Sequence, residues 1–241
     1  MELALAADVS QRHLSWLETG KSHPSREMVI RLCEALDVPL RERNALLQAA
    51  GYAAVYLESD LQAPSMAPVL GVLTQILEHH DPLPAFVIDR FWNVVKQNRS
   101  AGLLLSMAGD LSHLYDGPVP NLALLTLHPE GLRRYIANWD QAAPGFIRRL
   151  EREYLASGDL AVRRTLGSYI EMANVLPDVL TEAPSPVMPL ELRIGELALS
   201  VFSVISTFGT PSDVTTDELR IEAFYPSDES TEAFFANAAL N

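Results

Sequence analysis

Closely spaced helix-breaking residues divide the first part of the chain into short helices, and no other feature of the sequence constrains the fold as strongly. Apolar residues at helical spacing predict helices over residues 2–7, 11–19, 26–36 and 40–50. Ser10 and Ser25 stand just before two of them, where a side-chain oxygen accepts a hydrogen bond from an unpaired backbone N–H. Gly51 follows the last helix, where a positive φ is favourable. Residues 1–55 are therefore predicted to form a small all-α bundle.

The core of this bundle is predicted from the inward-facing positions of the same helices. These positions are Leu14 and Leu17, then Val29, Leu32, Cys33 and Leu36, and finally Leu46, Leu47 and Ala50. Cys33 is the only cysteine of the chain, which excludes a disulfide framework and a cysteine metal site. Its place on the apolar stripe favours a small core residue over a reactive thiol.

The triplet Gly20-Lys21-Ser22 suggests a nucleotide-binding loop, but the residues before it do not fit one. A phosphate-binding loop needs a glycine at position 15, where the chain has Ser15 inside a predicted helix. A helix, a tight turn at Asp8 and a second helix fit instead. The exposed face of that second helix carries Gln11, Arg12, His13, Ser15 and Trp16. Such a face is typical of a helix that reads base edges in the major groove.

The stretch VSQRHLSWLETGKSHPSREMVIRLCEALDVPL resembles the lambda-repressor-like, or Xre-type, helix-turn-helix family. By position, the resemblance implies a DNA-binding set of Gln11, Arg12 and Trp16 at base edges, His13 on the same face, and Ser10, Lys21, Ser22, His23 and Ser25 near phosphates. Asp8 stands where the family usually has glycine, and aspartate tolerates a left-handed backbone better than most residues. The alternative is a helical bundle with a purely structural role.

The resembled fold has an opening helix that covers the core of the bundle. Met1 lies in or just before the first helix of the motif, so the resemblance implies that one upstream helix is missing. Without it, part of the apolar surface formed by Leu14, Leu17, Val29, Leu32 and Leu46 is expected to face water.

The charge of the chain is unevenly distributed. The formal net charge is −13, yet residues 1–52 carry six basic and seven acidic residues, which leaves nearly all the acidity downstream. DNA contact is therefore expected through residues 1–52. The uncharged stretch at residues 197–212 is too short for a membrane span, and Glu2 and Asp8 do not fit a signal peptide. No contact with a membrane is predicted, and the expected location is cytoplasmic.

Residues 64–241 are predicted to form an α+β domain with an antiparallel sheet. A helix over residues 66–80 precedes PAFVIDRFWNVVKQNRSAGLLL, which is typical of strand, turn, strand and helix. Residues 129–173 have helical spacing, and LELRIG, ELALSVFSVISTFG and ELRIEAFYP predict three further strands, the middle one central. His79, His80 and Asp81 lie next to one another at a helix end and point in different directions, so no metal site is predicted.

The same region resembles the PAS-like ligand-binding domain of MmyB-type transcription regulators. The similar segments are AFVIDRFWNVVKQNRSA, HPEGLRRYIANW and TFGTPSDVTTDELRIEAFYP, in that order. The resemblance implies an apolar cavity that can take up a fatty-acid-like ligand. Candidate lining residues are Phe86, Phe91, Trp92, Trp139, Phe202 and Phe208, although these aromatics can equally fill an ordinary core. Arg134 is a candidate for a carboxylate head group, with a surface arginine as the alternative.

Together these features predict a DNA-binding transcription regulator that senses a small apolar or amphipathic ligand and forms a homodimer. No cofactor is predicted, and a bound fatty acid is a candidate ligand. The alternative is an interaction module whose second domain binds a protein and no small molecule. An enzyme is the third reading, and no catalytic residue is assigned, because the chain lacks a Gly-x-Ser-x-Gly elbow, a His-Glu-x-x-His motif and a glycine-rich dinucleotide loop.

Overall fold

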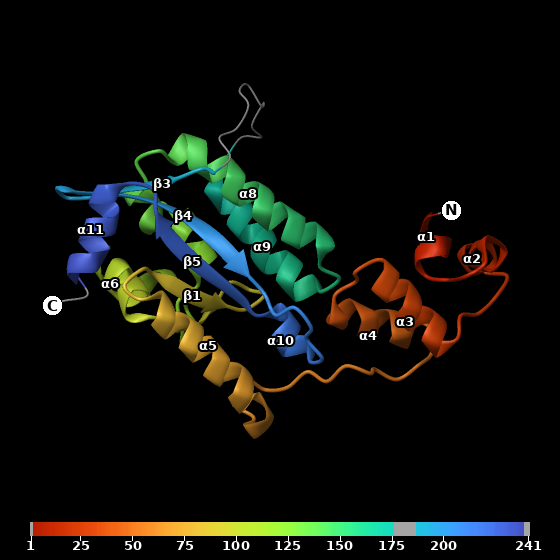
Figure 1. The fold of residues 1–241 in the computed structure, drawn as a ribbon. Helices are drawn as coiled ribbons and strands as arrows, with labels where there is room; N and C mark the ends of the chain where they lie inside the picture. Colours follow the sequence, from red (N-terminus) through yellow and green to blue (C-terminus); the bar gives the residue numbers. More distant parts are fainter. Residues whose placement is uncertain (1, 176–186, 239–241) are drawn as a thin grey trace. The chain divides into compact units, whose positions relative to one another are not determined.

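A computed structural model describes residues 2–175 and 187–238 of the chain (Figure 1). The chain divides into two compact units. The first unit comprises Met1–Met66 together with Phe208–Asp217, and the second comprises Ala67–Thr207 together with Glu218–Asn241. The sequence analysis predicts a second domain over residues 64–241, which includes residues 208–217. In the structure these residues pack in the first unit.

The first unit contains four short helices, each ending one residue before its predicted end. They are α1 (Glu2–Ala6), α2 (Gln11–Glu18), α3 (Arg26–Ala35) and α4 (Leu40–Ala49). The predicted N-caps are confirmed, because the hydroxyl of Ser10 accepts from the backbone N–H of His13 and that of Ser25 from Met28, both at 3.2 Å. Asp8 adopts a φ of 52° and Gly51 a φ of 84°, so both turns take the left-handed conformation expected for them.

The core of the first unit is smaller than the sequence predicts. Val29, Cys33 and Leu47 are buried in it. Leu36 was predicted to be a core residue, and this is wrong, since it is 57% exposed. Leu46 has core spacing but is 48% exposed, in line with the expectation that part of this apolar surface faces water. Burial raises the pKa of the Cys33 thiol, which fits its expected role as a core residue.

Residues 208–217 are joined to the first unit by hydrogen bonds that sequence patterns do not reveal. The helix α10 (Val214–Glu218) follows Asp213, whose carboxylate accepts from the backbone N–H of Ser59 at 3.1 Å. The carboxylate of Asp217 accepts from the N–H of Leu40 at 2.8 Å. Since Pro39 gives α4 no side-chain cap, Asp217 supplies the cap from a distant part of the chain.

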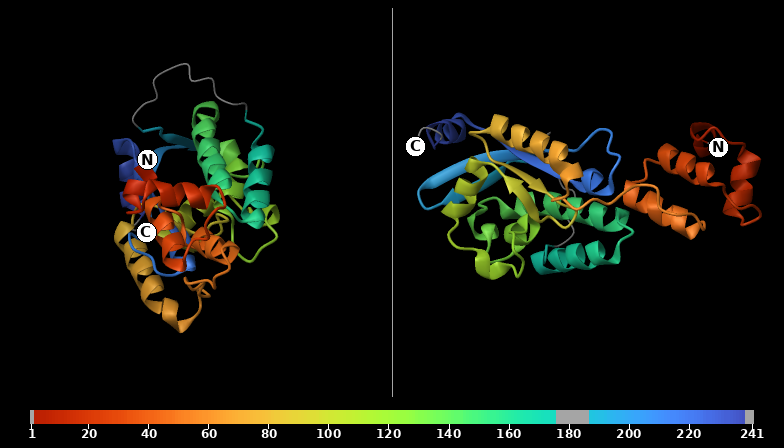
Figure 2. Two further views of the ribbon diagram at one scale, coloured as in Figure 1. Left: turned by 90° about the vertical axis from the view of Figure 1, so that its right-hand side faces the viewer. Right: turned by 90° about the horizontal axis from the view of Figure 1, so that it is seen from below.

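The second unit is a five-stranded antiparallel sheet with helices on both faces (Figure 2). The strands are β1 (Ala85–Ile88), β2 (Val94–Gln97), β3 (Leu190–Ile194), β4 (Leu197–Ser206) and β5 (Arg220–Pro226), in the order β2-β1-β5-β4-β3. The helices are α5 (Ala67–His80), α6 (Arg99–Met107), α7 (Leu122–Leu127), α8 (Trp139–Ala156), α9 (Leu160–Ala173) and α11 (Glu229–Ala238). Short 3-10 turns cover Pro64–Met66 in the first unit and Ser112–Leu114 and Leu132–Tyr135 in the second. The predicted α+β class, with two strands, a helical insert and three strands, is confirmed.

Asn98 follows the first hairpin of the second unit, where the sequence predicts the start of a helix. Asn98 caps α6 by accepting from the N–H of Ala101, and it also accepts from the N–H of Ala85, both at 3.0 Å. One buried amide thereby joins the start of β1 to the helix after β2. Trp92, in the β1–β2 turn, has a φ of 71°, which is unfavourable for a bulky residue and is stabilised here by complete burial of the side chain.

The strand β4 is central in the sheet only along part of its length. Its partner β3 pairs with it from Leu197 to Val201, while β5 pairs with it from Val201 to Ser206. Beyond Val201 no described strand lies on the β3 side, and Val204 and Ile205 are 43% and 41% exposed. No helix in the described residues is both long and apolar enough to span a membrane.

Candidate functional site

The exposed face of α2 carries most of the residues expected to read DNA bases. Gln11, Arg12 and Trp16 are exposed, and His13 is half-buried. The guanidinium of Arg12 lies 4.5 Å from the centre of the Trp16 ring, one turn further along the helix. This cation–π contact holds the arginine fork against a flat apolar surface, which limits its rotamers. A guanidinium in this setting can donate two parallel hydrogen bonds to a guanine edge.

The residues expected near phosphates lie in the turns at both ends of α2 and at the start of α3. The carbonyl of Trp16 accepts from the backbone N–H groups of Lys21 and Ser22, at 2.8 and 3.2 Å, so the turn after α2 has a fixed shape. Gly20 makes this turn with a φ of 69°. His23 and Ser25 follow it, and Ser10 precedes α2. All the predicted DNA-binding residues lie between Ser10 and Ser25 in the first unit, and their contact with DNA stays a prediction.

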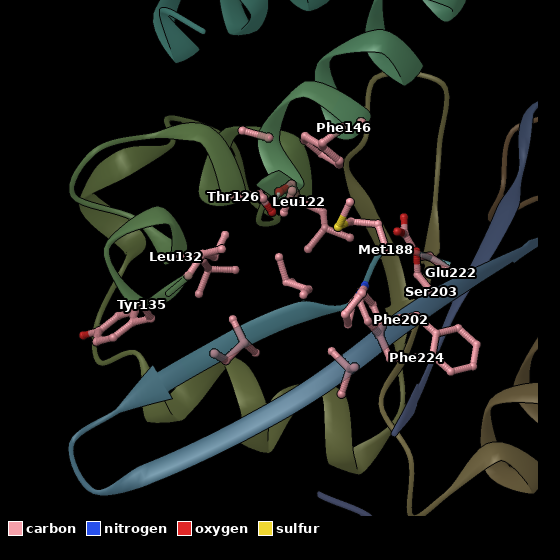
Figure 3. Close-up of a pocket in the computed structure, with 18 of the residues that line it drawn as sticks. Leu122, Thr126, Leu132, Tyr135, Phe146, Met188, Phe202, Ser203, Glu222 and Phe224 are labelled. Atoms are coloured by element: carbon pink, nitrogen blue, oxygen red, sulfur yellow. Dashed lines mark hydrogen bonds between the residues drawn. The ribbon is translucent and has the colours of Figure 1, made fainter. Parts of the chain in front are cut away.

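The second unit contains a cavity of about 310 Å³ between the sheet and the helices α6, α7 and α8 (Figure 3). This volume lies at the lower end of the range of small-molecule sites, which is about 300–1,000 Å³. Most of its wall is apolar, and the apolar lining includes Phe86, Leu104, Leu105, Leu122, Leu132, Ile136, Trp139, Phe146, Leu190, Leu192, Val201, Phe202 and Phe224.

Three of the predicted ligand residues line this cavity, namely Phe86, Trp139 and Phe202. Phe91 and Trp92 do not, because the β1–β2 turn directs them into the packed core, where Trp92 meets Phe146 edge to face at 5.1 Å. Phe208 lies in the first unit, outside the cavity lining.

Arg134 also lies outside the cavity lining. It is exposed, donates to the carbonyl of Ala108 at 3.3 Å and stacks on Tyr135 at 4.9 Å. Its contacts are those of a surface arginine, which was the alternative reading.

Charged residues at the cavity were missed by sequence reasoning. We use the term charge cluster for Arg149, Glu153, Arg220 and Glu222. Arg149 donates to both carboxylate oxygens of Glu222, at 3.1 and 3.2 Å, and through Nε to Glu153 at 3.3 Å. Arg220 also forms an ion pair with Glu153. Arg149, Arg152 and Glu222 line the cavity.

Trp92 fixes the orientation of the charge cluster. Its indole N–H donates to Glu153 at 2.8 Å, and the guanidinium of Arg149 lies 4.1 Å from the centre of its ring. The Nη2 atom of Arg149 is buried and has no hydrogen-bond partner among the described residues. An unmade hydrogen bond of this kind costs about 1–3 kcal/mol.

The described residues contain no group of three or more histidine, cysteine, aspartate or glutamate side chains that could hold a metal ion. His80, one of the histidines considered from the sequence, instead makes a 3.0 Å hydrogen bond to the carbonyl oxygen of Phe224.

Comparison with known proteins assigns both units to families. Residues 71–238 match the MmyB-like transcription regulator ligand binding domain, and residues 1–46 match a helix-turn-helix domain. Among solved structures, the PAS domain from Bordetella pertussis BvgS aligns with 72% of this chain and 96% of its own, at 13% identity and a TM-score of 0.30. The comparison with curated proteins returns no match.

The match at residues 71–238 covers most of the chain, and it coincides with the unit that contains the cavity. The helix-turn-helix match coincides with the segment that carries the exposed face of α2. The chain therefore belongs to the MmyB-like transcription regulators, with a DNA-binding helix-turn-helix domain followed by a ligand-binding domain.

Proposed function

We propose that the chain is a sequence-specific transcription regulator whose second unit senses a single-chain apolar or fatty-acid-like molecule. The observation that carries this proposal is the cavity of about 310 Å³, whose wall is apolar over most of its area. A well-packed core leaves few voids larger than a water molecule, so a cavity of this size favours a site for an apolar occupant.

In this proposal α2 is the helix that enters the major groove. Gln11, Arg12 and Trp16 contact base edges, with His13 beside them, while Lys21, Ser22 and His23 approach the phosphates after the helix. Ser10 and Ser25 flank this surface. The chain acts as a homodimer, since two copies of the helix can then read half-sites about 34 Å apart.

Ligand binding would act on DNA affinity by a population shift. A ligand that fits one packing of the second unit better than another stabilises that packing by its difference in affinity. The separation of the two recognition helices in the homodimer would change with it, and so would the affinity for a two-part operator.

The proposal is tested by adding dodecanoate to the purified chain and measuring its melting temperature and its tryptophan emission. Binding to the folded state alone raises the stability by about 2.7 kcal/mol at a hundredfold excess over Kd. Trp139 lines the cavity, so its emission is expected to change as well. If neither quantity changes with any long-chain acid, the second unit is better described as a protein-interaction module, for which the exposed Val204 and Ile205 of β4 would offer a surface.

A further inference from the structure

The connection between β4 and β5 leaves the second unit and then returns to it. The strand β4 ends at Ser206, and β5 begins at Arg220. Between them, Phe208–Asp217 belongs to the first unit, whereas Thr207 and Glu218 belong to the second. We use the term docking segment for Phe208–Asp217. The first unit therefore includes a piece of chain whose two ends continue directly into strands of the second unit.

Both of these strands form part of the cavity wall close to the docking segment. Ile205 of β4 and Glu222 of β5 are paired in the sheet, and both line the cavity. Figure 3 shows Ser203 and Glu222 close together on this wall. The next pair, Ser206 and Ile221, is the last one before the connection. A change in the spacing of the two strands at the cavity would therefore reach the docking segment through only a few residues.

Hydrogen bonds join the docking segment to the chain that follows α4. The N–H of Val214 donates to the carbonyl of Leu57 at 2.8 Å, and the N–H of Ser59 donates to the carboxylate of Asp213 at 3.1 Å. The hydroxyl of Thr215 donates to the carbonyl of Ser59 at 2.7 Å. The side chain of Val214 is buried, so the attachment is apolar as well as polar. Release of the docking segment would leave these backbone groups without the partners that they have here.

The docking segment also holds the start of α4, and α4 is linked to the predicted DNA-binding surface. Asp217 caps this helix at the N–H of Leu40. Side chains of α3 and α4 share the core of the first unit. Tyr52, just after α4, donates its hydroxyl to the carbonyl of Pro24 at 2.9 Å. Pro24 lies in the turn that is expected to approach the phosphates, so the helix capped by the docking segment is joined to that turn.

We infer that the docking segment couples the cavity to the DNA-binding surface, with Asp213 and Asp217 as positioning residues that act through α4 and the chain after it. This inference rests on the proposed function, because it names the route by which occupation of the cavity regulates DNA binding. An occupant that alters the spacing of β4 and β5 shifts the balance between a docked and a released segment. In the released state α4 loses its cap, and the turn at Pro24 is held less firmly.

The experiment measures coupling in the full chain with dodecanoate as the probe. The operator Kd is measured with and without saturating dodecanoate, and the quotient of the two values is the coupling ratio. The dodecanoate Kd, measured with and without operator, must change by the same factor, because coupling between two binding sites is reciprocal. The wild type is expected to show a coupling ratio of about 5- to 150-fold.

Two variants test the docking segment itself. Asp217→Ala removes the cap of α4, and Thr215→Val removes one hydroxyl at nearly constant shape. Each is expected to bring the coupling ratio several-fold closer to one. The dodecanoate Kd without DNA should equal that of the wild type, since neither residue lines the cavity. A purely structural role would instead change the operator Kd by the same factor with and without dodecanoate, which leaves the coupling ratio unchanged.

Asp110→Ala is the matched control for Asp217→Ala. The carboxylate of Asp110 accepts from the backbone N–H of Ser112 at 2.9 Å, in the second unit and outside the cavity lining. This variant removes the same charge and a similar hydrogen bond to the backbone, but it does not touch the docking segment. Its coupling ratio should equal that of the wild type.

The possible failures can be distinguished. A coupled wild type beside an unchanged ratio in either docking-segment variant, or an equal loss of coupling in Asp110→Ala, would overturn the role of the docking segment and leave the proposed function in place. A wild type that does not bind dodecanoate, or binds it without any change in the operator Kd, would overturn the proposed function and this inference with it.

Discussion

Gly145 offers a direct test of the space inside the second unit. It lies within α8 and lines the cavity. A Cβ atom added at this position would come no closer than 4.0 Å to a neighbouring atom, the Nη2 of Arg148. Glycine in a helix interior is less favourable than alanine by about 1 kcal/mol. Because no neighbouring atom has to move, Gly145→Ala should raise the free energy of unfolding by most of this difference.

For a chain of this size, a gain of about 1 kcal/mol raises the melting temperature by roughly 2–4 °C. Differential scanning calorimetry of the intact chain measures it. Gly167→Ala is the matched control: it lies in α9 outside the cavity lining, and its added Cβ would meet the ring of Tyr154 at 3.6 Å, an ordinary contact. Both variants should be stabilised. A destabilised Gly145→Ala beside a stabilised Gly167→Ala would mean that the space next to residue 145 is filled, and the cavity argument would fail.

Three further predictions concern other parts of the chain. Arg12→Ala should lower the affinity for the preferred operator by about 1–3 kcal/mol and relax the preference at one base pair per half-site, whereas Lys21→Ala should weaken all sequences alike; selection from a randomised operator library distinguishes these outcomes. Asp217→Ala removes the cap of α4 and should destabilise the first unit by about 1 kcal/mol, seen as faster hydrogen exchange at the start of α4; unchanged exchange there would show that the cap is dispensable. Burial raises the pKa of Asp159, but the N–H of Ala161 and the charge of Arg90 outweigh it and lower the pKa overall. The stabilisation is therefore present above about pH 4 and lost as the pH falls further, and Asp159→Asn should flatten this part of the acid-unfolding curve.

The parts of the fold that depend on local chemistry were predictable from the sequence. Ser10 and Ser25 identify two helix starts because a hydroxyl before an apolar-periodic segment caps it whatever the surroundings. Alternation in LELRIG identifies β3, in which Leu192 is buried between exposed Glu191 and Arg193. In each case the signal and the structure it specifies lie within a few residues of each other.

The parts that depend on distant packing were not predictable. Nothing near Leu40 indicates that Asp217 caps its helix, since the two residues lie far apart in the sequence. Leu46 has the spacing of a core residue, yet its exposure depends on which elements cover its helix face.

The charge cluster at the cavity was missed for a related reason. Alternation in ELRIEAFYP suggests an outward Glu222, but helices cover both faces of the sheet and both Ile221 and Glu222 are buried. The sequence suggests Arg134 as an anion ligand, and nothing in it indicates Arg149. Only the packing of α8 against β5 distinguishes them, by placing Arg149 beside Glu222.

The central claim is that occupation of the cavity changes DNA binding. The most direct measurement is the affinity of the full chain for its selected operator, by fluorescence anisotropy at fixed salt, with and without saturating dodecanoate. A coupling free energy of about 1–3 kcal/mol, typical of allosteric proteins, predicts that the operator Kd changes by roughly 5- to 150-fold. The affinity for non-operator DNA should change much less. An operator Kd that stays the same while calorimetry shows the cavity to be saturated would contradict the account.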